Sequence, residues 1–154
     1  SAAPLAALRR AAVADPSLPV RFAAVMHGAV PDPAAAPAFC QRLRAEREPA
    51  DLLALLGAAL PALRQLAEAP AADLVGFADR HRGFQNPARF AALLVAAEAV
   101  DPTLTPACAR ARAARDAGAA VTAEALRDAG LVGPALGAEL LRRRQAAAAA
   151  HETG

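Results

Sequence analysis

Residues 20–26 predict an apolar helix that ends in one imidazole, His27, and the residue that follows is Gly28. Metal-dependent hydrolases gather several His and Asp side chains around one ion, so a His-Asp pair would place a carboxylate at position 28. The other two histidines, His81 and His151, lie far along the chain. A lone neutral imidazole does not hold a divalent cation in competition with water. We therefore predict no metal site, and favour His27 as a helix-end side chain bonded to backbone carbonyls over a catalytic relic.

Arginine is the second residue type that could do chemistry, because every basic residue of the chain is an arginine. The net charge is only +2, but the isoelectric point near 9 is a weak indication of nucleic-acid binding. Arginines of an RNA-binding protein contact phosphate oxygens without reading bases, whereas the alternative is a cation that suits a helix C-terminus. No aromatic residue lies within 110–115 or 142–144, so we expect these arginines to contact duplex RNA and its backbone rather than stacked bases. The candidate RNA-binding residues are Arg80, Arg82, Arg110, Arg112, Arg115, Arg142, Arg143 and Arg144.

The composition predicts a cytoplasmic, helical protein without disulfides. Hydrophobic residues make up 56% of the chain and aromatic residues 3%, so the core must rest on Leu, Val, Phe and closely packed Ala. Cys40 and Cys108 match no metal-ligand spacing, which indicates two buried thiols in a reducing compartment. No segment has the pattern of a signal peptide or the length of an apolar membrane span, so we expect no membrane partner.

The chain has a helical pattern throughout, interrupted by prolines and glycines, which predicts an all-α fold. We expect Pro61 to kink or divide one helix and Thr122 to cap another. The alanine- and arginine-rich stretch 106–118 predicts a solvated helix. We divide the chain into a compact helical core, 1–103, and a more exposed C-terminal arm, 104–154. Helices are expected over 5–13, 19–28, 39–44, 50–66, 70–81, from 87 onward, and over 106–118, 123–129 and 135–149.

Three segments, in this order, resemble the C-terminal region of bacterial multifunctional CCA-adding enzymes, which are tRNA nucleotidyltransferases. Residues 20–28, VRFAAVMHG, look like the helix that ends in His-Asp in the HD domain of that family. Residues 39–44, FCQRLR, resemble the helix that follows it. Residues 129–145, AGLVGPALGAELLRRRQ, look like the closing motif, in which a Gly-x-x-Gly turn opens a helix with a basic end. The resemblance implies a compact HD-like helical bundle followed by a shorter helical arm.

The resemblance also implies elements that this sequence lacks. The head of the family uses Mg²⁺ with ATP and CTP, through a Gly-Ser loop and an Asp-x-Asp pair, and neither motif occurs here. The HD ligands are missing too, because Gly28 replaces the aspartate and residues 60–63, LPAL, stand where another His-Asp is expected. We expect a chain that holds no cofactor, and the sequence leaves open whether it is an enzyme.

These observations leave three hypotheses. We favour a non-catalytic region that binds tRNA and supports a nucleotidyltransferase head, if one lies upstream. The first alternative is a metal-dependent phosphodiesterase or phosphatase of the HD class, acting on 2′,3′-cyclic or 2′-phosphate ends. The second is a structural helical module that docks on a protein, which an exposed apolar patch would favour.

Overall fold

The computed structural model describes residues 2–30 and 32–152, and in this part of the chain every regular element is helical, which confirms the predicted all-α fold. The elements at the N-terminal end are α1 (Ala2–Ala14), α2 (Leu18–Met26), η1 (His27–Ala29), η2 (Pro33–Ala35), α3 (Ala36–Leu43), α4 (Arg47–Gln65) and α5 (Ala71–Arg80). They are followed by α6 (Pro87–Val100), η3 (Pro102–Leu104), α7 (Thr105–Ala119), α8 (Glu124–Asp128) and α9 (Gly133–Glu152). None of the described helices is long and apolar enough to cross a membrane.

Local sequence signals explain the starts of α5 and α6. Pro70 precedes α5 in extended backbone, and the Asn86 side chain accepts the Arg89 N–H at the start of α6. Helix α4 is continuous through Pro61, so the expected division is wrong, and a kink there stays a prediction. The expected cap on the short helix that follows α7 is also wrong. Helix α8 begins after Ala123 without a side-chain cap, so Thr122 does not cap it.

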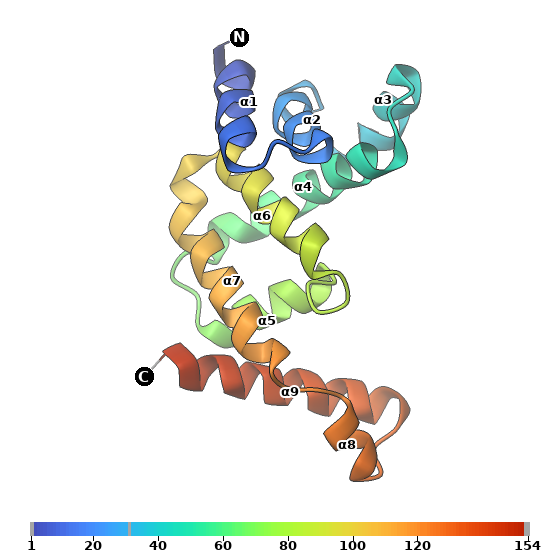
Figure 1. Cartoon of the computed structure of the whole chain (residues 1–154), viewed down its shortest axis with the longest axis vertical. Helices are drawn as coiled ribbons and strands as arrows, with labels where there is room; N and C mark the ends of the chain where they lie inside the picture. Colours follow the sequence, from blue (N-terminus) through green and yellow to red (C-terminus); the bar gives the residue numbers. More distant parts are fainter. Residues whose placement is uncertain (1, 31, 153–154) are drawn as a thin grey trace.

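The helices form two groups that share one hydrophobic core (Figure 1). Helices α1, α2, α4 and α6 pack together in the upper part of Figure 1. Helices α5, α7 and α9 pack together in the lower part, where α9 lies across the end of the molecule. The core runs through both groups, from Val20 in α2 to Phe77 in α5 and Ala148 in α9. The two cysteines, Cys40 and Cys108, are buried free thiols, as predicted.

Helix α7 is not the solvated helix that its composition predicts. Its alanines form a stripe that is buried, including Ala107, Ala111 and Ala114, beside Cys108. Burial raises the pKa of the Cys108 thiol to about 12. Small side chains let helices pack closely, and α7 contacts both α5 and α9. The division near residue 103 stays a prediction, and helix packing crosses it.

Candidate nucleic-acid interface

The turn between α5 and α6 presents arginines at the surface. Arg82 has a left-handed backbone, with φ of 58°, and this ends α5. The Gly83 N–H then donates to the carbonyl of Ala78 at 2.7 Å. A Cβ on Gly83 would lie 3.0 Å from that oxygen and from Phe90 Cγ, so the tight turn requires glycine here.

Two arginines from other helices hold this turn in place. Arg115 of α7 donates from Nε to the carbonyl of Gly83 at 3.1 Å. The Arg144 guanidinium of α9 lies 4.0 Å from the centre of the Phe84 ring, which is a cation–π contact. Burial lowers the pKa of Arg144 from its ordinary value. Arg115 and Arg144, both predicted to bind RNA, therefore make contacts within the protein that position the turn.

Arg80 and Arg82, in contrast, are exposed, and neither side chain has a hydrogen-bond or ion-pair partner within 2–30 and 32–152. His81 lies between them and is half-buried, with its ring centre 4.5 Å from that of Phe77. Burial, and then the Arg80 charge, lower the pKa of His81 below 6.5. At neutral pH the turn therefore presents two free cations, and His81 is a neutral ring packed against the protein.

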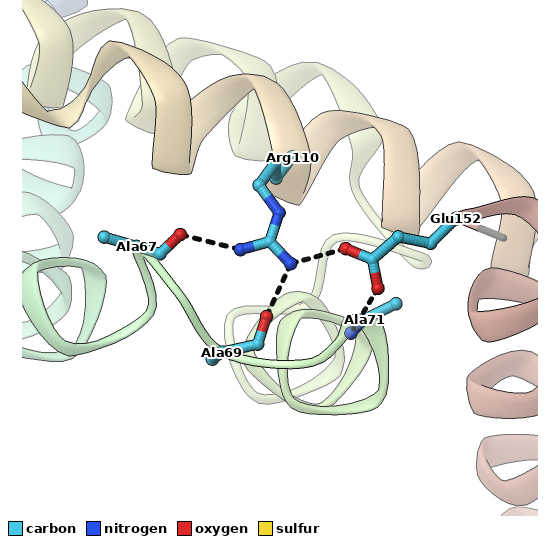
Figure 2. A network of polar contacts seen from close by, with 5 residues as sticks. All are labelled: Ala67, Ala69, Ala71, Arg110 and Glu152. Carbon is cyan, nitrogen blue, oxygen red and sulfur yellow. Dashed lines mark hydrogen bonds and ion pairs between the residues drawn. The ribbon is translucent and has the colours of Figure 1, made fainter.

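Arg110 and Arg112 also make intramolecular contacts. Figure 2 shows Arg110 donating to the carbonyls of Ala67 at 2.7 Å and Ala69 at 2.6 Å, and pairing with Glu152. Arg112 Nη2 lies 2.6 Å from Glu98 Oε1 of α6. Both guanidinium groups thus connect α7 to neighbouring segments.

Arg142 and Arg143 share one carboxylate on α9. Arg142 binds both oxygens of Glu139, at 2.8 and 2.7 Å, and Arg143 Nε lies 2.8 Å from Oε1. These hydrogen bonds lower the pKa of Glu139 to about 2. The two cations are exposed, and one negative charge offsets part of their field.

His27 ends α2 and is half-buried, and burial followed by the Arg64 charge lowers the pKa of its imidazole. Its ring makes no hydrogen bond in the part of the chain that the structure describes, so the predicted bonds to backbone carbonyls are wrong. Across those same residues, no group of three or more His, Cys, Asp or Glu side chains is placed to hold a metal ion.

Two grooves differ in their charge. A groove of about 520 Å³ between the α1–α2 linker, α4 and α6 has Asp15, Glu48 and Asp51 beside two arginines, so its lining does not favour phosphate. A groove of about 360 Å³ between α4, α5 and α9 has one carboxylate, Asp73, and one arginine, Arg80, among its lining residues. Arg80 has no partner among the described residues, so this groove offers one free cation next to the α5–α6 turn, together with the Asp73 carboxylate.

Arginine pairing was the feature that the sequence could not predict. Arg115 binds the carbonyl of Gly83, which lies 32 residues before it in the sequence. Arg144 contacts the ring of Phe84 in the same turn. Phe84 was not among the residues singled out from the sequence. The only early signal for the free pair was the Arg-His-Arg triplet at a helix end, at 80–82.

The chain is similar over nearly its whole length to two curated proteins of Pseudomonas putida. It is 36% identical to the CCA-adding enzyme of strain F1 and 34% identical to the multifunctional CCA protein of strain KT2440. Each match covers 97% of this chain and 41% of the relative, so the chain spans less than half the length of these relatives. No family model and no solved structure matches.

Proposed function

We propose that this chain, which matches a partial region of the CCA-adding tRNA nucleotidyltransferases, binds tRNA through its phosphates and contributes no catalytic group. The observation that carries the proposal is the pair of unpartnered arginines, Arg80 and Arg82, on a turn that two other arginines hold rigid. A fixed turn loses little conformational freedom on binding, so its cations are already placed for an anion.

Phosphate is the chemistry that fits these cations. Arginine donates in a planar fork that matches phosphate oxygens. Arg142 and Arg143 on α9 add a weaker basic surface, because Glu139 offsets part of their charge. Contacts of this kind hold the body of a folded RNA without reading its sequence.

In a longer protein, we propose that the chain supports a nucleotidyltransferase head. The Mg²⁺, ATP and CTP of the reaction would then bind to that head. In the described part of this chain no cluster of metal-ligating side chains supports the alternative of an HD-class phosphodiesterase, and that alternative stays a prediction.

The test is a filter-binding titration of the chain with an unmodified tRNA transcript at several salt concentrations. The affinity of the wild type should fall as salt rises, because bound arginines release counterions from phosphates. The double variant Arg80→Gln/Arg82→Gln should bind more weakly, and its log–log salt slope should be smaller by about 2.

The matched control is Arg9→Gln/Arg21→Gln, which removes the same charge from two exposed residues of α1 and α2. We expect this control to keep nearly the whole slope. Wild-type chain that does not bind tRNA at low salt would refute the proposal, and so would equal losses in the two double variants.

A further inference from the structure

The groove beside Arg80 has polar side chains along one face of α5. Asp73, Gly76 and Arg80 are spaced three and four residues apart, so they lie on the same side of the helix. Gln65 of α4 and Gln145 of α9 complete the polar lining. Gln145 is fixed by donating from Nε2 to the carbonyl of Ala72 at 3.3 Å.

Gly76 is in the interior of α5, where glycine is less favourable than alanine because it loses more backbone entropy on folding. Packing explains the glycine at position 118 of α7, where a Cβ would lie 3.2 Å from the Phe84 ring. At Gly76 a Cβ would meet no protein atom within 4 Å. The missing side chain therefore serves no internal contact, and it leaves open space over the helix where Gly76 lines the groove.

The chemistry along this face fits one unit of an RNA backbone. Arg80 offers a free cation for a phosphate. Asp73, about 10 Å away along the helix axis, is exposed and offers a carboxylate that can accept a hydrogen bond from a hydroxyl group. Between them lies the open space over Gly76, where a sugar can approach the helix closely.

We propose that the groove over Gly76 seats a ribose–phosphate unit of an RNA strand, with the phosphate on Arg80 and the ribose 2′-hydroxyl donating to Asp73. This inference rests on the proposed RNA-binding function and adds a preference for RNA over DNA. The 2′-hydroxyl is the group by which a protein distinguishes the two at one site.

The variant Gly76→Ala tests the inference in the whole chain. Alanine should raise the melting temperature by about 2–4 °C, because it favours the helix and meets no protein atom. The same methyl group should weaken binding of an RNA hairpin on the order of tenfold, since it occupies the place of the sugar. Binding of the DNA hairpin of the same sequence should change less.

The matched control is Gly137→Ala in α9, a helical glycine whose added Cβ would also meet nothing within 4 Å. It lines neither groove described above, so it should raise the melting temperature and leave both affinities unchanged. Unchanged RNA binding by Gly76→Ala would overturn the groove as a contact, and equal losses for RNA and DNA would overturn the ribose contact. If the wild-type chain shows no salt-dependent binding of RNA, the proposed function itself is refuted.

Discussion

Arginine has two uses in this chain, and what lies within reach of each guanidinium decides between them. Arg110 and Arg115 donate to backbone carbonyls of loops, where helix and sheet partners are not available. Arg144 covers an aromatic ring. Arg80 and Arg82 reach no such group. Several arginines of this chain thus serve as internal hydrogen-bond donors. The number of arginines in the sequence therefore overstates how many are available to bind RNA.

The structural use of Arg144 can be measured by Arg144→Met, which keeps an apolar side chain and removes the cation. We expect the free energy of unfolding in urea to fall by about 1 kcal/mol, the size of a partly buried cation–π contact. The control Arg127→Met changes an exposed arginine of α8 and should stay within about 0.5 kcal/mol of the wild type. Equal effects of the two substitutions would contradict the role assigned to Arg144.

At the scale of the elements, helix α9 is attached at its C-terminal end by one carboxylate. Glu152 accepts the N–H of Ala71, the first residue of α5, at 3.2 Å and pairs with Arg110 of α7 (Figure 2). A single side chain therefore joins the ends of α5 and α9 and, through Arg110, the loop that precedes α5. The hydrogen bond from Arg110 is the main reason that the pKa of Glu152 is lowered.

This attachment should weaken in acid. A carboxyl whose pKa is lower in the folded than in the unfolded chain stabilises the fold above the unfolded value, about 4.3 for Glu. The contribution is lost as pH falls through the folded pKa. We expect hydrogen-exchange protection of the Ala71 amide, corrected for the intrinsic rate, to decrease between pH 6 and 3. The Phe90 amide, which donates to the carbonyl of Asn86, is the internal control.

The variant Glu152→Ala separates this carboxylate from general acid effects. Its Ala71 amide should exchange faster than that of the wild type at pH 6. Because alanine at position 152 does not titrate, the protection of this amide should not decrease further between pH 6 and 3. A pH dependence equal to that of the wild type would assign the effect to another carboxyl group.

Helix boundaries could be predicted from the sequence where the signal lies within one helical turn. Burial could not be predicted where it depends on packing between helices. Asn86 and Pro87 begin α6 as expected, since a cap and a fixed φ act within one turn. The buried face of α7 was not predicted, because alanines become core only when α5 and α9 cover them. Helix α4 likewise continues through Pro61, an exposed residue of a helix that its neighbours Leu60 and Leu63 anchor in the core.

At the scale of the whole molecule, the two helix groups are joined through their core. Helix α5 lies before residue 103 in the chain but packs mainly with α7 and α9, which follow it. The residues of α5 that are buried include Leu74, Val75 and Phe77. A boundary drawn from composition separates these side chains from the helices that cover them.

A fragment of residues 1–103 tests the predicted division. Without α7 and α9, the apolar face of α5 would be exposed to water, at a cost of roughly 25 cal/mol for each Å². We expect the full chain to unfold in one cooperative transition, and the fragment to unfold with little cooperativity and to bind a hydrophobic dye. Both are measurable by thermal circular dichroism and dye fluorescence. A fragment that melts cooperatively near the temperature of the full chain would instead support an independent core ending near residue 103, with α5 stable on its contacts with the N-terminal helices alone.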